Sequence, residues 1–390
     1  MSARSFVLLG AALSLAAVLH APGTGAEKGW RKTVIDPVFR AEGAAIADFN
    51  GDGRMDILAG SLWYESPTWK PHAIRKLGAF NRATGYSDCF LCFARDVNGD
   101  AFPDAVLVGF PGQASAWYQN PGRSAGEWKE HVITESACNE SPVLADVDGD
   151  RTPELVTPHA EKRMCVYRIQ NGDFKKFVIG ADDDPGCKRF SHGLGVGDVS
   201  GDGRPDILCT DGYYEGRPLK DGALWKFVRT PIGPACAQMY VEDLDHDSDG
   251  DVISSSAHGI GVWWHEQISG PAGPRFQTHV IDETFSQSHS MMRADLDGDG
   301  RQDYVTGKRF WAHGPKGDVL PNHPSVLYSY SPERGSDGDV RWTRRLIDDD
   351  SGVGTGFQIG DVDGDGRPDI ATANKRGVFL FVQSRPEQNR

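Results

Sequence analysis

Acidic residues recur in this sequence at a spacing that suits the binding of a hard cation. The pattern D-x-[D/N/S]-x-D-x-x-x-[D/E] occurs seven times, beginning at Asp48, Asp96, Asp146, Asp198, Asp243, Asp295 and Asp361. In most copies carboxylates stand at relative positions 1, 3, 5 and 9, with glycines where the backbone must turn sharply. Oxygen ligands on alternate residues of a tight turn can converge on one calcium ion, as in the EF-hand. The bidentate Glu at position 12 and the flanking helices of the EF-hand are missing here.

We therefore predict several structural Ca²⁺ sites in seven loops. The expected ligands are Asp48, Asn50, Asp52 and Asp56; Asp96, Asn98, Asp100 and Asp104; Asp146, Asp148, Asp150 and Glu154; Asp198, Ser200, Asp202 and Asp206; Asp243, Asp245, Asp247 and Asp251; Asp295, Asp297, Asp299 and Asp303; and Asp361, Asp363, Asp365 and Asp369. These positions hold 25 of the 55 acidic residues, so seven divalent ions would bring the net charge of -14 to about zero. Loops two to four are the weakest candidates, because they depart from the pattern at Ala101, Arg151, Glu154 and Ser200.

Short apolar runs flank each acidic loop, which places each loop in a β-hairpin. The first Asp residues are 48, 50, 52, 45, 52 and 66 residues apart, a period typical of a radial repeat of four-stranded blades. A second recurring element has an aromatic residue followed by alternating polar and apolar residues, and we interpret it as the outermost strand. It occurs at residues 30–35, 69–74, 128–133, 174–179, 225–232, 276–281 and 342–347.

The first outer strand precedes every acidic loop, whereas the last blade ends at residues 379–382 with no outer strand after it. Pairing residues 30–35 into the last blade would remove two open sheet edges, which otherwise invite aggregation. The sequence therefore predicts an all-β fold, a seven-bladed β-propeller over residues 27–390 that is closed by its N-terminal strand.

The repeat also allows equivalent positions of the blades to be compared. Since the acidic loops lie on one face, the opposite end of the inner strands is the expected mouth of the central channel. Six residues before each first Asp stand Glu42, Phe90, Glu140, His192, Ala237, His289 and Thr355. Beyond the second strands, on the same face, come His159, Asp211, His258, Lys308, Arg309, Lys375 and Arg376. These residues either hydrate the channel or form a site for a metal, a sugar or an anionic intermediate.

For a catalytic mouth, the expected roles follow from the residue types. His192 and His289 are predicted as metal ligands or acid/base groups, and Glu140 as a ligand or base, with a second divalent metal at the mouth. Lys308 and Arg309 would stabilise an enolate or carboxylate. His258 is a second acid/base candidate, and Tyr213 with Tyr214 could donate a proton or stack on a sugar. The list of candidate catalytic residues is thus His192, His258, His289, Glu140, Lys308 and Arg309.

Two further segments carry expectations of their own. The longest interval between loops, residues 308–347, carries His313 and His323 and is either a lid over the mouth or a loose insertion.

The sequence has seven cysteines, enough for up to three disulfides in an exported protein. Cys89 and Cys92 form a C-x-x-C pair, but on a strand they would point to opposite faces, which argues against a zinc or redox role.

Residues 1–26 are predicted to be a Sec-type signal peptide, which places the mature chain in the periplasm or outside the cell. Arg4 precedes an apolar run at residues 6–19, which is too short for a good transmembrane anchor, and small residues follow it.

The sequence shows no basic stripe with interleaved aromatic residues, so nucleic acid is not an expected partner. The oligomeric state is left open.

The acidic loops resemble the FG-GAP or VCBS repeats of integrin-like and bacterial exported propellers. A closer likeness, over nearly the whole mature chain, is to the propeller domain of aldos-2-ulose dehydratase and its bacterial relatives. The matching segments are residues 108–112, 117–122, 139–142, 192–198, 257–259, 306–314 and 374–377. The resemblance implies a seven-bladed propeller with structural divalent ions and, in the dehydratase, lyase chemistry on a keto sugar. That enzyme carries cupin domains after its propeller, whereas this sequence ends at Arg390, so steps that need a cupin metal are not expected here.

Two classes of function remain open at this stage. The first is a carbohydrate-active lyase or dehydratase that acts on a keto sugar or oxidised glycoside; a glycosidase with Glu42 and Glu140 as its carboxylate pair is a variant of this class. The second is a non-catalytic propeller that binds a glycan or a protein on the same face. Fold alone does not choose between them.

Overall fold

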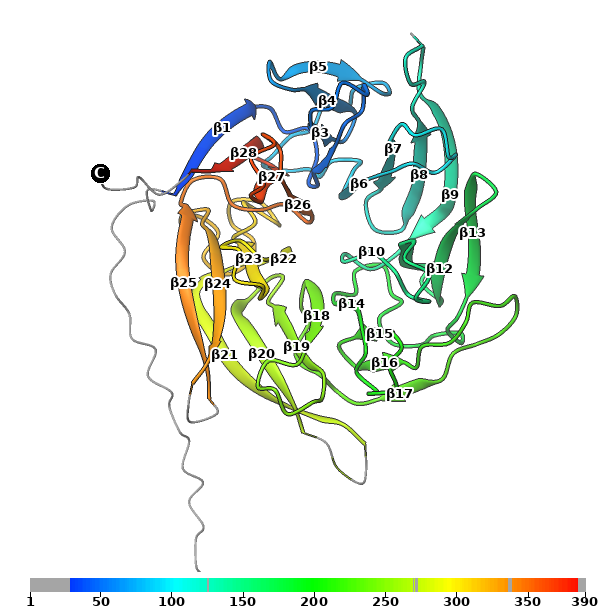
Figure 1. Cartoon of the computed structure of the whole chain (residues 1–390), viewed down its shortest axis with the longest axis vertical. Coiled ribbons are helices and arrows are strands. Elements are labelled where there is room, and N and C mark those ends of the chain that lie inside the picture. The colour runs from blue at the N-terminus through cyan, green and yellow to red at the C-terminus, as the bar shows by residue number, and fades with distance from the viewer. Residues whose placement is uncertain (1–28, 125, 269, 271–272, 336–338, 385–390) are drawn as a thin grey trace, which may run out of the picture.

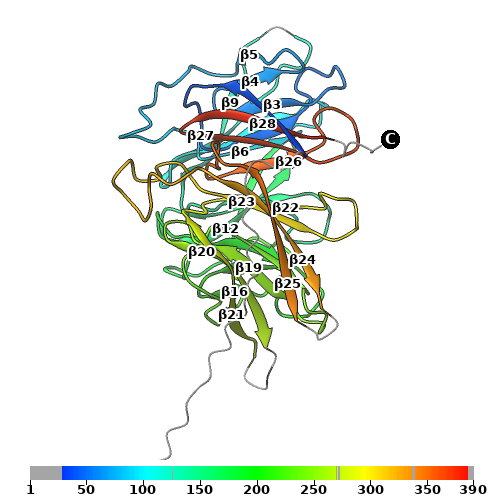
Figure 2. The ribbon, with the colours of Figure 1, turned by 90° about the vertical axis from the view of Figure 1, so that its left-hand side faces the viewer.

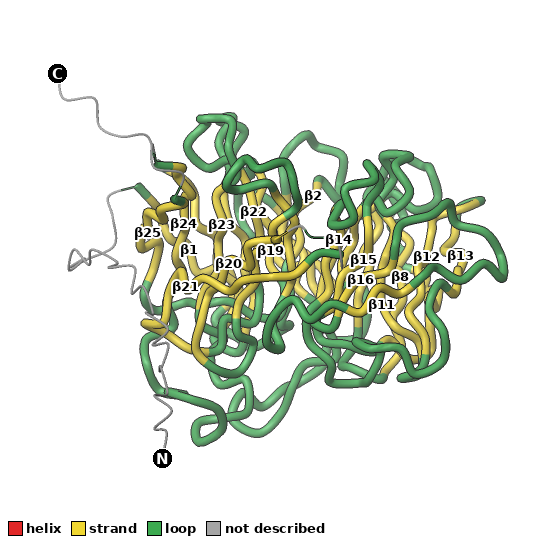
Figure 3. Tube along the Cα trace, turned by 90° about the horizontal axis from the view of Figure 1, so that it is seen from below, coloured by secondary structure: helices red, strands yellow, loops and turns green. Residues whose placement is uncertain are grey.

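The chain folds into an all-β ring of sheets. The computed structural model describes residues 29–124, 126–268, 270, 273–335 and 339–384. In this part of the chain strands run between two rims of loops and no helix occurs (Figure 3). Accordingly, the described residues include no helix that is long and apolar enough to cross a membrane. The predicted signal peptide, residues 1–26, lies outside the described residues.

The described strands follow one another in groups of four around the centre of the ring (Figure 1). Ladder contacts between Ala137 and His159, and between Leu194 and Gln238, join two pairs of neighbouring groups into eight-stranded sheets. The first three groups are β2 (Ala45–Ala47), β3 (Asp56–Ala59), β4 (Leu62–Glu65) and β5 (Lys70–Ala73); β6 (Leu91–Arg95), β7 (Asp104–Val108), β8 (Gln113–Gln119) and β9 (Lys129–Ala137); and β10 (Val143–Ala145), β11 (Glu154–His159), β12 (Arg163–Gln170) and β13 (Asp173–Val178). The next three are β14 (Leu194–Gly197), β15 (Asp206–Cys209), β16 (Gly212–Tyr214) and β17 (Phe227–Arg229); β18 (Gln238–Glu242), β19 (Asp251–Ser255), β20 (Ile260–Ile268) and β21 (Arg275–Ser286); and β22 (Met291–Ala294), β23 (Asp303–Gly307), β24 (Leu327–Arg334) and β25 (Val340–Asp348). Within each group the strands follow one another as an antiparallel meander.

The last group combines both ends of the chain. It contains β26 (Phe357–Gly360), β27 (Asp369–Asn374), β28 (Gly377–Gln383) and β1 (Trp30–Asp36), in the order β1-β28-β27-β26. β1 runs antiparallel to β28, with Trp30 opposite Gln383 and Val34 opposite Phe379 (Figure 1). The N-terminal strand thus supplies the outer edge of the sheet that ends the chain.

Burial changes regularly from the centre of the ring to its rim. The second strands are almost fully buried, as in β3, because neighbouring sheets pack against both of their faces. The outermost strands β1, β5, β9, β13, β17, β21 and β25 alternate between exposed and partly buried residues, as in β1. They include or overlap the seven segments that the aromatic pattern predicts as outer strands. The all-β class and the propeller architecture are therefore confirmed. Figure 2 shows the same ring of sheets from the side.

Each acidic loop joins an innermost strand to the second strand of its sheet. In the first loop both carboxylate oxygens of Asp48 accept backbone N–H groups, from Gly51 and from Gly53, each at 2.8 Å. The two glycines have positive φ angles of 70° and 86°, which their lack of a Cβ permits. Ala101 and Arg151 occupy the position of Gly53 in loops two and three with φ near 70°, so these loops keep the same backbone path at a steric cost.

The ninth residue of each loop is buried and binds the backbone. Asp56 accepts N–H groups from Phe49 at 3.0 Å and from Ser66 at 2.9 Å, which ties the loop to the end of β4. The corresponding bond to the second loop residue recurs at Asp104, Glu154, Asp206, Asp251, Asp303 and Asp369. Burial raises the pKa of Asp56 to about 7, although its backbone hydrogen bonds act in the opposite direction.

Candidate functional site

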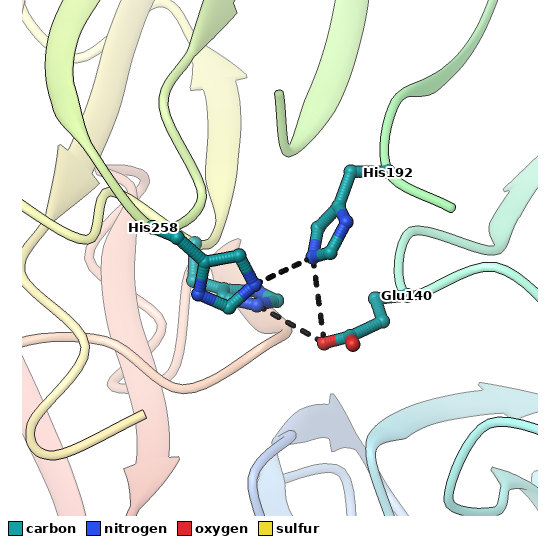
Figure 4. A group of neighbouring side chains, drawn as sticks. Glu140, His192 and His258 are labelled. Carbon is teal, nitrogen blue, oxygen red and sulfur yellow. Dashed lines mark hydrogen bonds and ion pairs between the residues drawn. The ribbon is translucent and has the colours of Figure 1, made fainter. Parts of the chain in front are cut away.

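The mouth opposite the acidic loops brings together side chains from four sheets. Glu140, His192 and His289 lie just before the inner strands β10, β14 and β22, and His258 lies in the turn after β19. Because each inner strand begins at this face, its preceding residue reaches toward the axis of the ring. Figure 4 shows Glu140, His192 and His258 pointing toward one another from separate parts of the chain.

The four side chains form one compact group. His192 Nε2 lies 2.9 Å from His258 Nε2 and 3.6 Å from Glu140 Oε2, while His289 Nε2 lies 3.1 Å from the same Glu140 oxygen (Figure 4). One ligand atom from each residue lies within 4.8 Å of all the others. The structure therefore brings together His192, His258, His289 and Glu140, which sequence reasoning selected as separate candidates.

The protonation states of His289 and Glu140 suit a divalent cation. Burial lowers the pKa of His289 to about 3, and the nearby Arg309 acts in the same direction, so this imidazole is neutral. Burial alone would raise the pKa of Glu140, but the contacts with His192 and His289 outweigh it and hold this pKa well below its usual range. Neutral imidazoles and an ionised carboxylate are the forms that bind metal ions. Neither ring nitrogen of His289 makes a well-directed hydrogen bond with the described residues, although Nε2 lies 3.1 Å from Glu140 Oε2, so a cation would give Nε2 a directed partner.

Arg309 adds a buried positive charge beside the group of Glu140 and the three histidines. It donates to Glu42 Oε1 in a short hydrogen bond, and its other terminal nitrogen lies 3.9 Å from Glu140 Oε2. Both Glu42 Oε2 and Arg309 Nε are buried without a hydrogen-bond partner in the described part of the chain. The ring of Tyr86 lies 5.8 Å below the Arg309 guanidinium, and Lys375 Nζ lies 4.3 Å from the same ring.

The two lysines of the mouth bind other partners than the group of Glu140 and the three histidines. Lys308 Nζ donates to Ser286 Oγ at 2.9 Å, and Lys375 Nζ donates to the carbonyl of Trp311 at 2.9 Å. Burial lowers the pKa of each amine to about 8. Of the predicted cationic residues, Arg309 is thus the one that approaches Glu140. Lys308 instead contacts Ser286 of β21, and Lys375 contacts the insertion.

The segment between β23 and β24 covers the mouth, as the lid hypothesis predicts. Gln287 binds it at two points, accepting the backbone N–H of Ala312 at 3.2 Å and donating to the carbonyl of Val319 at 3.1 Å. The ring of His313 lies 4.6 Å from the ring of His258. His323 is exposed farther along the segment. The backbone of this segment is therefore bonded to the loop between β21 and β22, which favours the lid over a loose insertion.

Below the mouth, the inner strands enclose a cavity of about 300 Å³ around the axis. Its lining includes Pro142 and Ser290, which lie close in sequence to Glu140 and His289, together with apolar residues such as Leu144 and Met239. The group of Glu140 and the three histidines therefore stands at one end of this cavity.

The comparison with protein families supports the repeat that the sequence predicts. Residues 96–157 match an FG-GAP-like repeat and residues 353–384 match an FG-GAP repeat. The chain carries FG-GAP repeats. The first matched segment includes the second and third acidic loops, and the second includes the seventh. The comparison with curated proteins gives no match.

Similar solved structures cover most of this chain at low identity. One is an Agrocybe aegerita lectin, described with specific recognition of non-reducing terminal N-acetylglucosamine; it is 15% identical, has a TM-score of 0.48, and the match covers 92% of this chain and 86% of the lectin. Another is BBS1N in complex with ARL6DN, soaked with mercury, at 11% identity and a TM-score of 0.48, with 92% and 97% covered. At these values neither protein indicates what the present chain binds.

Several interpretations of single residues need correction. Cys89 and Cys92 do not point to opposite faces: Cys89 precedes β6, and the two Sγ atoms lie 3.2 Å apart. All seven cysteines are buried free thiols. Tyr213 and Tyr214 are buried on β16 in the cores between sheets, where Tyr214 donates to Asp184, so they do not line the mouth.

Other mouth candidates have partners of their own. His159 Nδ1 lies 2.8 Å from Thr134 Oγ1 on β9, and Asp211 is exposed. Sequence reasoning also missed two residues of the mouth, Tyr86 and Asp318. Neither occupies a position that repeats from blade to blade, so no comparison of equivalent positions could have found them.

Proposed function

We propose that this protein is an exported, calcium-stabilised propeller with a carbon–oxygen lyase site at the channel mouth, acting on a keto sugar or an oxidised glycoside. The observation that supports the proposal is the buried group of Glu140, His192, His258 and His289 beside Arg309. Removing water or a glycosidic oxygen beta to a carbonyl requires a base, a positive centre for the enolate, and an acid for the leaving oxygen.

A divalent cation held by the four residues would polarise the substrate carbonyl and stabilise the enolate oxygen. Ligand-atom separations of 2.9 to 3.6 Å suit neighbouring positions around one such ion, and the mixed nitrogen and oxygen set favours a metal of the zinc or manganese type over calcium. When no cation is present, one proton lies between His192 Nε2 and His258 Nε2, and binding of a cation by both nitrogens requires that this proton leave.

Residues around this group would supply further charge stabilisation, the base and the acid. Arg309 would share the enolate charge, because its guanidinium lies 3.9 Å from Glu140 and carries a free Nε–H. Glu42 Oε2, which has no hydrogen-bond partner among the described residues, would accept the proton of the carbon acid. Burial raises the pKa of Tyr86, so its phenol stays protonated at neutral pH and can protonate the leaving oxygen.

The decisive test is incubation with 2-keto sugars, oxidised glycosides and uronate polysaccharides while the absorbance of the unsaturated product is followed. Added Zn²⁺ or Mn²⁺, in the presence of Ca²⁺, should increase the rate. If no substrate yields an unsaturated product, the lyase proposal fails. Glycan affinity at the same face would then favour the binding function instead.

Calcium removal is expected to destabilise the propeller in a pH-dependent way. Burial raises the pKa of Asp56, Glu154 and Asp251 to about 7 in the ion-free fold. The ion-free folded state therefore binds more protons than the unfolded state between about pH 4 and 7, and its free energy of unfolding rises as the pH falls through this window. Calcium binds the ionised carboxylates, so its stabilisation is largest at pH 7 and above.

The measurement is the melting temperature in excess EDTA and in excess Ca²⁺, at pH 5.5 and pH 7.5. We expect Tm in EDTA to be lower than in Ca²⁺, and the difference to be greater at pH 7.5. An unchanged Tm in EDTA at both pH values would contradict structural calcium binding.

A further inference from the structure

We propose that Asp318 is a positioning residue for the mouth, which holds the Nδ1 proton of His258 and thereby presents the Nε2 lone pair to the metal-binding group. This inference rests on the proposed function and assigns a task to the segment that covers the mouth. No position equivalent to Asp318 recurs in the other blades.

The contacts of Asp318 place a carboxylate between two imidazoles. Its Oδ1 lies 3.4 Å from His258 Nδ1, a buried nitrogen that makes no closer polar contact with the described residues, and both of its oxygens lie 2.9 Å from His313 Nδ1. Only 9% of the Asp318 side chain is exposed, so water competes weakly for these contacts. An ionised carboxylate accepts hydrogen bonds and donates none, so the His258 nitrogen that faces it is the one that carries a proton.

The other nitrogen of His258 then has a free lone pair. His258 Nε2 lies 2.9 Å from His192 Nε2, inside the group with Glu140 and His289. In the metal-free protein this distance requires that His192 donate and His258 accept. In the metal-bound protein both nitrogens face the cation. A carboxylate behind a ligating histidine is the arrangement that fixes the ring and raises its basicity in metal sites.

A second cation between His258, His313 and Asp318 is the alternative use of the same atoms, since these three also form a compact set. Charge argues against it. Among the described residues of the mouth, the largely buried charged side chains are the carboxylates of Glu42, Glu140 and Asp318 and the cationic groups of Lys308, Arg309 and Lys375. One divalent ion would bring their net formal charge to +2, and two ions would bring it to +4.

The backbone around Asp318 is fixed independently of any metal. The carbonyl of Val319, the next residue, accepts from Ser286 Oγ at 2.6 Å and from Gln287 Nε2 at 3.1 Å. The covering segment therefore holds the carboxylate against His258 before a cation binds. A segment that is seated over the mouth should therefore raise the affinity for the cation, and a bound cation should in turn stabilise the seated segment.

The test measures Co²⁺ binding to the full chain in saturating Ca²⁺, which fills the oxygen-rich loops and leaves the nitrogen-rich mouth for cobalt. Visible absorption bands of Co²⁺ report its ligation by imidazole. Asp318→Asn should raise the Kd for Co²⁺ about 10- to 100-fold, and Asp318→Glu should recover part of the lost affinity. The matched control is Lys316→Ala, an exposed residue of the same segment, which should bind as the wild type does.

A second readout separates this inference from the proposed function. In the metal-free protein, nitrogen-15 NMR should show His258 protonated at Nδ1, and Asp318→Asn should shift the proton toward Nε2. If the wild type binds no Co²⁺ through imidazoles, the proposed metal site fails, while the NMR result still decides the role of Asp318. Wild-type affinity in Asp318→Asn, or a proton on Nε2 of His258 in the wild type, would overturn the inference.

Discussion

Replacing His289 or Glu140 with the neutral, similarly sized glutamine is expected to lower both turnover and Co²⁺ affinity by at least about 100-fold, with little change in Tm. Both side chains are buried and make their contacts with each other and with the mouth, so their loss removes ligand atoms rather than strand pairing. Glutamine keeps most of the side-chain volume, which limits the cavity that alanine would leave. His192→Ala should act in the same direction.

Two controls separate chemistry from stability in this experiment. His159→Gln changes a histidine on the same face that binds Thr134 and has no contact with the metal-binding group in the described structure, so activity should be kept. Asp361→Ala removes the residue that accepts the N–H groups of Gly364 and Gly366 in the seventh loop, so Tm should fall with a lesser effect on intrinsic chemistry. If the variants of Glu140, His192 and His289 all kept wild-type activity and affinity, the mouth would not be the functional site.

The sequence predicts those residues of the site that occupy equivalent positions in the repeat. Glu140, His192 and His289 stand at the same offset from their acidic loops, and a ring of equivalent sheets must bring such positions to one place. The offset of six residues is thus sufficient to predict proximity between side chains more than 140 positions apart. His258 follows from the same argument, applied to the end of the second strand.

The remaining contacts depend on irregular segments, for which the repeat supplies no rule. Asp318 reaches His258 only because Gln287 binds the covering segment at two separated backbone groups. The pairing of Glu42 with Arg309 joins residues from different repeats through long side chains, whose directions spacing does not define. The error at Cys89 has the same origin, since the alternation of a strand was extended to a residue that precedes β6.

Deleting residues 1–35, so that the chain begins at Asp36, is expected to abolish the cooperative unfolding transition or to cause aggregation. β1 covers the edge of β28, and without it the backbone groups of β28 lose their partners along the whole register from Val378 to Gln383. The residues of β28 from Val378 to Val382 are buried apolar side chains, so the new edge would be both hydrogen-bonding and hydrophobic. Such an edge is a template for pairing with a second chain.

Closure by β1 also joins sheets that are not consecutive in the chain, which makes the deletion more severe than the loss of an ordinary edge strand. Lys32 Nζ forms an ion pair with Asp348 of β25 at 2.9 Å, and Asp36 accepts from Tyr64 of β4 at 2.8 Å, so β1 contacts the sheets on both sides. The matched control is a chain that begins at Glu27, which keeps every residue of β1 and should melt as the full chain does. Size-exclusion chromatography and thermal melting distinguish the outcomes. A soluble monomer with normal Tm after the longer deletion would show that the ring is held by the remaining inter-sheet packing, and that β1 is dispensable.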